Sequence, residues 1–131
     1  MRLLLDTHVL LWLAADPERL GDAAHLLADP ETELLLSAAS AWEITIKQAS
    51  GRLALPYPPR QWLETRLPRL GVTSLPITWQ DTAAVADLPP LHRDPFDRLL
   101  VAQARRHDLV LATADRVLSG YDVRRLDVGQ V

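Results

Sequence analysis

Several residue types that define common classes of protein are missing from this chain of 131 residues. It contains no cysteine, which excludes disulfide bonds and thiolate metal sites, so any metal must be bound by oxygen or imidazole ligands. It has no run of the roughly 18 apolar residues that a membrane helix needs, and the short run after Arg2 is not a signal peptide. We therefore expect a soluble, cytoplasmic protein.

The chain also has no excess of basic residues, because its net charge is −3. This balance argues against a generally basic surface that coats nucleic acid, but it allows a local basic patch. Hydrophobic residues make up 48% of the chain, which is enough for one hydrophobic core at this length. The composition thus predicts a single domain over residues 1–131.

Short apolar segments alternate with helical patterns along the chain. Continuous apolar runs, typical of parallel strands covered on both faces, occur at 2–6, 33–37, 72–76 and 109–113, with a weaker edge strand at 122–127. Helical patterns occupy 7–15, 20–28, 39–50, 60–67, 78–86 and 95–107. The alternation predicts an α/β fold in which layers of helices cover a mainly parallel sheet.

Polar side chains follow these strands at the points where the strands end. In open α/β sheets, ligands bind beyond the carboxyl ends of the strands, so residues at these points are expected to converge on one edge. The acidic ones repel each other unless a cation lies between them, and Mg²⁺ or Mn²⁺ prefers carboxylate oxygens. The residues concerned are Asp6, Ser37, Ser40, Glu43, Asp94, Asp97, Thr113 and Asp115.

Two of these acids have structural explanations that the sequence leaves open. Asp6 can cap the helix that begins at Thr7, because aspartate is a preferred N-cap residue. Glu43 lies four residues before Lys47, which is the spacing of an exposed ion pair on a helix. The stripe that carries both residues can face a cleft as easily as solvent.

Capping also offers an explanation for the later acids. Asp94, Pro95 and Asp97 fit the N-cap, N1 and N3 positions of the last long helix, which accounts fully for Asp94 but less well for Asp97. Asp115 can cap a short turn in the same way. No single acid is decisive, and the hypothesis of a metal site depends on all of them together.

The histidines and tryptophans are expected to serve mainly in packing. His8, His25 and His107 fall on predicted helices, whereas His92 lies in the loop before Asp94, close to the predicted site. Among the tryptophans, we expect Trp12 and Trp42 to lie in the core. Trp62, together with Leu63 and Leu67, is a candidate for contact with a partner.

Four motifs together give the chain a family resemblance. The segments LLLDTHVLLWL, SAASAWEITIKQASGRL, HRDPFDRLLVAQA and LVLATADRVL occur in this order between residues 3 and about 127. Their sequence and spacing resemble the PIN-domain family, specifically the VapC-type toxins of toxin–antitoxin pairs. The resemblance implies a three-layer α/β/α fold with a central sheet of four to five strands.

The resemblance also implies an activity and a site. The activity is that of a Mg²⁺- or Mn²⁺-dependent endoribonuclease, which hydrolyses RNA phosphodiester bonds with metal-activated water. The implied metal ligands and catalytic residues are Asp6, Glu43, Asp97 and Asp115. The implied supporting residues are Thr7, Ser40 and Thr113, with Asp94 an alternative to Asp97 as the closer ligand. As residues that steer RNA phosphates we predict Lys47, Arg93, Arg98 and Arg116.

The implied partners are an RNA substrate, a second copy of the chain in a homodimer, and a cognate antitoxin whose C-terminal tail covers the acidic site. Two other functions stay open at this point. One is a catalytically inactive PIN-like binding module. The other is a phosphatase of the haloacid-dehalogenase type, which requires a second acid two residues after the first, where this chain has His8. No motif indicates the RNA target.

Overall fold

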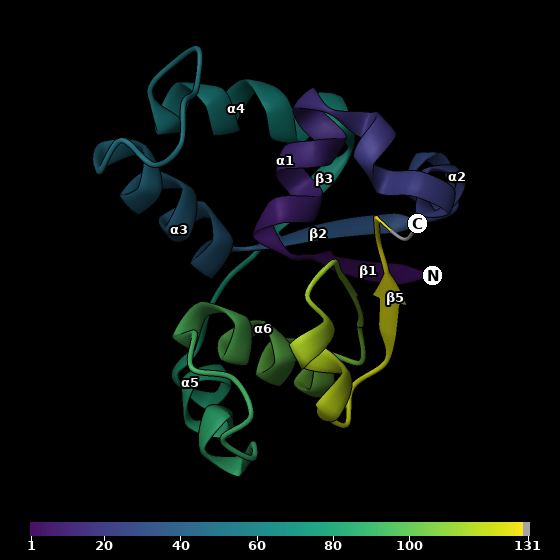
Figure 1. The fold of residues 1–131 in the computed structure, drawn as a ribbon, viewed down its shortest axis with the longest axis vertical. Helices are drawn as coiled ribbons and strands as arrows, with labels where there is room; N and C mark the ends of the chain where they lie inside the picture. Colours follow the sequence, from purple (N-terminus) through teal and green to yellow (C-terminus); the bar gives the residue numbers. More distant parts are fainter. Residues whose placement is uncertain (130–131) are drawn as a thin grey trace.

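The computed structural model describes residues 1–129 and contains a five-stranded, fully parallel sheet (Figure 1). The strand order is β3-β2-β1-β4-β5. The strands are β1 (Arg2–Leu5), β2 (Glu33–Ser37), β3 (Val72–Leu75), β4 (Val110–Thr113) and β5 (Arg125–Asp127). The predicted α/β fold is therefore confirmed, and β5 is an edge strand as expected. The predicted domain of residues 1–131 includes two residues that lie outside the described ones.

The helices agree with the predicted ones at most positions. The α helices are α1 (Thr7–Ala15), α2 (Ala24–Ala28), α3 (Ala38–Ala49), α4 (Pro59–Leu70), α5 (Trp79–Ala84) and α6 (Pro95–Arg106). Three 3₁₀ helices accompany them, namely η1 (Pro17–Ala23), η2 (Val85–Asp87) and η3 (Arg116–Gly120). Among the described residues, no helix has the length and apolar character needed to cross a membrane.

Two helices differ in extent from their predictions, and in both the observed boundary lies at a glycine with a positive φ. The helix expected at 20–28 is broken, because Gly21 has φ +62° and separates two helical segments that cannot be continuous. The helix expected at 60–67 continues through Pro68 to Leu70. It ends where Gly71 adopts the left-handed conformation with φ +69°.

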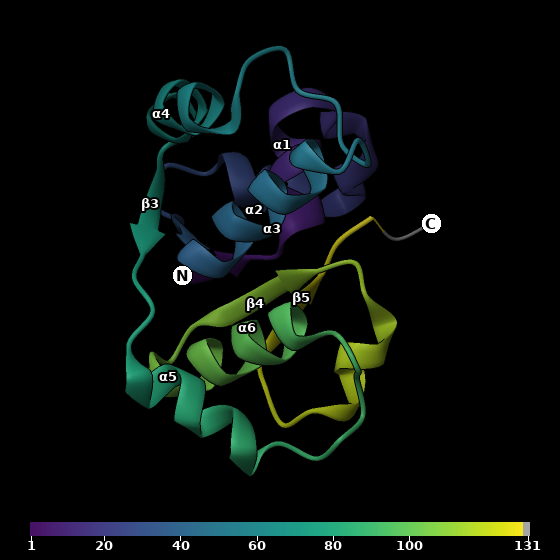
Figure 2. The same cartoon turned by 90° about the vertical axis from the view of Figure 1, so that its left-hand side faces the viewer.

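Two hydrophobic clusters cover the two faces of the sheet, because side chains alternate along each strand. Leu3 and Leu5 of β1 belong to the cluster that includes buried residues of α1 to α4, whereas Leu4 belongs to the cluster with α6. Figure 2 shows α1 to α4 on one side of the strands and α5 and α6 on the other. The three layers implied by the resemblance are therefore present.

The tryptophan predictions were wrong at two positions. Trp62 is only 3% exposed and belongs to the cluster beneath α4, so it is not available to a partner. Trp42 is 63% exposed and lies on the outer surface of α3. Helical spacing alone did not show which face of α3 and α4 meets the sheet. Trp12 is partly buried and packs against the core, as expected.

The register of the central strands brings their carboxyl ends to the same level. Leu5, the last residue of β1, is paired with Leu36 of β2 and with Ala112 of β4. The next residue along β1 is Asp6, whose backbone N–H donates to the carbonyl of Ala112 over 2.9 Å. Polar residues that follow β1, β2 and β4 are consequently neighbours in space.

Candidate active site

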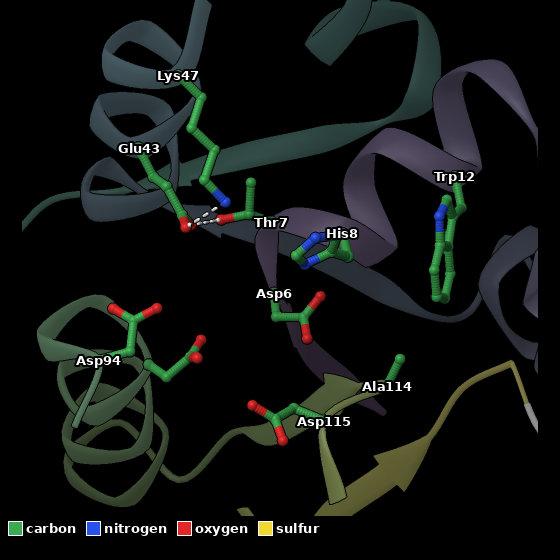
Figure 3. A pocket seen from close by; sticks show the side chains of 10 residues that line it. Asp6, Thr7, His8, Trp12, Glu43, Lys47, Asp94, Ala114 and Asp115 are labelled. Carbon is green, nitrogen blue, oxygen red and sulfur yellow. Dashed lines mark hydrogen bonds and ion pairs between the residues drawn. The ribbon is translucent and has the colours of Figure 1, made fainter. Parts of the chain in front are cut away.

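A cavity of about 320 Å³ opens at this edge of the sheet and carries five carboxylic acids. Figure 3 shows side chains from the ends of β1 and β4 and from α1, α3 and α6 around it. The four predicted metal ligands line it, as do Thr7 and Lys47. The full lining is Asp6, Thr7, His8, Trp12, Glu43, Lys47, Asp94, Asp97, Ala114 and Asp115.

Asp6 is the most buried acid of the cavity, with 4% of its surface exposed. It is the N-cap of α1, because its Oδ1 accepts a hydrogen bond of 2.8 Å from the backbone N–H of Val9. Its Oδ2 accepts one of 2.6 Å from the hydroxyl of Thr113. Burial raises the pKa of Asp6, and these two hydrogen bonds oppose that effect. The capping explanation is therefore correct, and it coexists with a place in the cavity.

Glu43 lies on α3, and two polar side chains contact its carboxylate. The hydroxyl of Thr7 donates to its Oε1, and Nζ of Lys47 lies 2.9 Å from its Oε2, both drawn as dashed lines in Figure 3. Glu43 is 8% exposed and lines the cavity, so the stripe of α3 faces the cleft and not the solvent. The Lys47 ammonium offsets the negative charge of the glutamate in this partly desolvated position.

Asp97 stands at the third position of α6, where Asp94 already caps the helix through a 2.9 Å hydrogen bond from the N–H of Phe96. The pKa of Asp97 is raised to about 7, first because the carboxyl is desolvated and then because Asp94, Asp6 and Asp115 repel its charged form. The second acid of the DPFD motif is thus surplus to capping and faces the other carboxylates.

Asp115 completes the cavity from the loop after β4. Its Oδ1 accepts from the N–H of Val117 over 2.9 Å, and its own N–H donates to the hydroxyl of Thr113 over 3.0 Å. Nε2 of His92 lies 2.7 Å from Oδ2 of Asp115 and 3.2 Å from Oδ2 of Asp97. His92 therefore contacts two of the predicted ligands, and its nearness to Asp94 in the sequence was the only signal for this.

The other predicted polar residues lie around the cavity and do not line it. Ser40 is 1% exposed, and its hydroxyl has no hydrogen-bond partner among the described residues. Arg93 and Arg116 are exposed. Nη2 of Arg98 donates to the backbone carbonyls of Val85 and Leu88 over 3.3 Å each, so its position supports a role in holding that loop rather than RNA.

A divalent cation such as Mg²⁺ or Mn²⁺ fits the chemistry of these donors. The cavity offers carboxylate oxygens from Asp6, Asp97 and Asp115, and both burial and the neighbouring carboxylates raise the pKa of Asp97. Hard cations prefer such oxygen ligands. Glu43, which already has Lys47 as a partner, is the acid that needs a cation least.

A second buried polar network, which sequence reasoning missed, lies away from the cavity. Asp81 is 0% exposed and accepts from the N–H of Thr78, from the side chains of Gln103 and Arg106, and pairs with Nε2 of His107 at 3.0 Å. Thr78 and Asp81 form a capping box, and the T-x-x-D spacing is the sequence signal for it. Its contacts join α5 to the end of α6.

Comparison with known proteins agrees with the fold and the cavity. The model of the PIN domain matches residues 3–123. The chain is 34% identical over 119 residues to Ribonuclease VapC22 of Mycobacterium tuberculosis, covering 90% of each chain. It is 37% identical over 71 residues to Ribonuclease VapC16 of the same organism, covering 54% of this chain and 49% of that one.

Solved structures of low sequence identity share the fold. VapBC2 from Rickettsia felis, solved bound to a DNA fragment from its promoter, superposes with a TM-score of 0.74 at 15% identity, covering 98% of this chain and 99% of that one. FitAcB from Neisseria gonorrhoeae gives a TM-score of 0.67 at 22% identity, covering 95% and 96%. The chain thus has a parallel α/β fold with an acidic cavity at the carboxyl ends of its strands. The chain belongs to the PIN-domain family.

Proposed function

We propose that this protein is a metal-dependent endoribonuclease and the toxin component of a VapBC-type toxin–antitoxin system. The observation that carries the proposal is that Asp6, Glu43, Asp97 and Asp115, from four separate segments of a PIN fold, line one cavity. The named relative with 90% coverage is a ribonuclease of the VapC group, which supports the same activity. RNA is therefore the proposed substrate.

The proposed chemistry divides the work among the acids. Asp6, Asp97 and Asp115 would hold Mg²⁺ or Mn²⁺, which when bound lowers the pKa of water and offsets charge on a phosphate. Thr113 fixes the carboxylate of Asp6 for this role. Glu43, which pairs with Lys47 and accepts a hydrogen bond from Thr7, would accept a proton from an attacking water.

The two other functions considered from the sequence are now less well supported. The phosphatase of the haloacid-dehalogenase type finds no support, because the chain belongs to the PIN family and His8 stands where that chemistry needs an acid. An inactive binding module has no need of five carboxylic acids in one cavity, since their mutual repulsion costs stability. Activity and metal binding distinguish the remaining possibilities.

The test is cleavage of a mixed RNA substrate by purified protein with Mg²⁺ or Mn²⁺, compared with EDTA. We expect metal-dependent cleavage that Asp6→Asn abolishes, while Asp22→Asn, a change at an exposed acid of η1, leaves it intact. Direct binding of Mn²⁺ is measured in parallel by calorimetry. Cleavage that persists in Asp6→Asn, or wild-type protein that binds no divalent cation, would contradict the proposal.

We further propose an antitoxin partner and a homodimer. Several structural neighbours are toxin–antitoxin complexes, such as VapBC-1 from nontypeable Haemophilus influenzae, which supports the antitoxin. An apolar groove beside the cavity supports self-association, because soluble monomers rarely expose contiguous apolar surface. It is lined by Ala39, Trp42, Ile46, Ile77, Thr82, Pro95, Phe96 and Leu99.

The exposed ring of Trp42 is the feature of this groove that a homodimer would bury. It meets the ring of Phe96 edge-on, with 5.4 Å between centroids. Trp42→Ala is expected to shift the protein from dimer to monomer in light scattering, whereas Trp79→Ala, at a ring that is 74% exposed outside the groove lining, is not. An unchanged molecular mass for Trp42→Ala would contradict this surface as the interface.

A further inference from the structure

His92 occupies the space between two of the carboxylates to which we assign cation binding. Its Nε2 is 2.7 Å from Oδ2 of Asp115 and 3.2 Å from Oδ2 of Asp97. The two oxygens therefore share one ring nitrogen as a common partner. Under the proposed function Asp97 and Asp115 would also hold a divalent cation, so the imidazole and the cation would share these carboxylate oxygens.

The position of the ring proton follows from the other side of the imidazole. The backbone N–H of Asp94 donates to Nδ1 of His92 over 3.0 Å, so Nδ1 is an acceptor. The ring proton then lies on Nε2, which donates to Oδ2 of Asp115, while Oδ2 of Asp97 lies 3.2 Å from the same nitrogen. A nitrogen that carries a proton has no lone pair for a metal, so in this arrangement His92 is a donor to the acids and not a ligand beside them.

The loop that carries His92 is fixed by contacts from several elements. The backbone N–H of His92 donates to the hydroxyl of Tyr121 over 2.9 Å, and Tyr121 is itself buried. Leu91 packs on Gly120 so closely that a Cβ there would lie 2.8 Å from Leu91 Cδ1. Arg98 binds the carbonyl of Leu88 at the start of the loop. These contacts hold the imidazole over the carboxylates.

We propose that His92 is a positioning residue that competes with the divalent cation for Asp97 and Asp115. Its Nε2–H donates to Asp115 and lies close to Asp97, and a cation that binds the same two oxygens must displace the imidazole from them. This inference rests on the proposed function only in the use of Asp97 and Asp115 as ligands. It assigns a role to a residue that lies outside the four acids.

Competition predicts opposite effects of removing the imidazole on cation affinity and on stability. His92→Ala is expected to bind Mn²⁺ about 10-fold more tightly than wild type, because a hydrogen bond to a charged group no longer has to be broken. The same variant is expected to unfold at lower urea concentration in EDTA. By linkage, this difference shrinks when Mn²⁺ is saturating.

The experiment combines Mn²⁺ calorimetry and urea unfolding, with and without Mn²⁺, on the full chain at one pH. His25→Ala, which removes an exposed histidine on α2, is the matched control and is expected to leave the Mn²⁺ affinity unchanged. His92→Gln, which keeps an N–H donor and most of the volume, is expected to bind Mn²⁺ with an affinity between those of wild type and His92→Ala.

The outcomes are distinct from one another. Weaker binding of Mn²⁺ by His92→Ala and His92→Gln would mean that His92 is a ligand, and would overturn the proposal. An unchanged affinity, with the same loss of stability in EDTA and in Mn²⁺, would mean a purely structural role and would overturn it too. If wild type binds no Mn²⁺, the metal dependence in the proposed function fails and the inference fails with it.

Discussion

The hydroxyl of Thr113 donates a 2.6 Å hydrogen bond to Oδ2 of Asp6, across 107 positions of the sequence. The contact joins the carboxyl ends of β4 and β1 inside the protein, where both residues are buried. It favours the charged form of Asp6 against the effect of burial. This hydroxyl and the N–H of Val9 are both hydrogen-bond donors that oppose the effect of burial on Asp6.

Replacing this hydroxyl is therefore expected to impair both folding and cation binding. Thr113→Val should lower the free energy of unfolding by about 1–3 kcal/mol, the cost of a lost buried hydrogen bond. It should also weaken Mn²⁺ binding, because the pKa of Asp6 rises further. Urea unfolding and calorimetry measure the two effects. Thr113→Ser, which keeps the hydroxyl, should retain wild-type Mn²⁺ affinity, and equal losses in Ser and Val variants would refute the role of the hydrogen bond.

Asp97 is expected to make the protein without added metal less stable as the pH rises. Its pKa of about 7 in the folded protein lies above the unfolded value near 3.8, so the folded state binds more protons between these values. Its contribution to stability is fully present below about pH 4 and is lost as the pH rises through 7. A shift of this size corresponds to at most about 4 kcal/mol.

Asp97→Asn tests this expectation in unfolding experiments at pH 5 and pH 8 in EDTA. The variant should be more stable than wild type at pH 8, since a repelled charge is removed, and its stability should change less between the two pH values. Saturating Mn²⁺ should stabilise wild type at pH 8 more than it stabilises the variant. A variant that is destabilised equally at both pH values would contradict the repulsion.

The contribution of Asp81 to the stability of the fold should have the opposite pH dependence. Hydrogen bonds from Thr78 and Gln103, together with His107 and Arg106, outweigh its burial and lower its pKa to about 2. Its contribution of about 2 kcal/mol is present above the unfolded value near 3.8 and is lost as the pH falls through 2. Asp81→Ala should therefore destabilise the protein at pH 7, by about 3 kcal/mol for a buried ion pair. Mn²⁺ affinity, measured on the folded variant, should stay unchanged because Asp81 does not line the cavity.

Arg93 and Arg98 are expected to differ in their effects, although both were predicted to steer RNA. Arg93 is exposed beside the cavity, so Arg93→Ala should weaken RNA binding and reduce its salt slope by about 1. Arg98→Ala should instead lower stability, because the carbonyls of Val85 and Leu88 lose their donor. Titration of an uncleaved RNA at several salt concentrations separates the two. A reduced salt slope for Arg98→Ala would instead support the prediction that Arg98 contacts RNA phosphates.

The order of strands and helices was open to prediction from the sequence alone. The apolar runs at 33–37 and 109–113 and the periodic pattern at 95–107 are local features, and they correspond closely to β2, β4 and α6. Capping was equally local, since an Asp-Pro pair before an apolar helix indicates the N-cap that Asp94 provides. At Gly21, which has a positive φ and breaks the helix expected at 20–28, the prediction of helix extent was wrong.

The tertiary structure decided which face each side chain presents and what it meets there. The approach of His92 to Asp97 and Asp115 depends on how a loop folds back over the sheet, and no local pattern contains that information. The burial of Trp62 and the exposure of Trp42 depend on how α4 and α3 are rotated against the strands. Sequence therefore determined the elements and the acids at their ends, because propensity and capping act between near neighbours. The pairing of charges was decided by packing, because it joins residues that only the folded chain brings together.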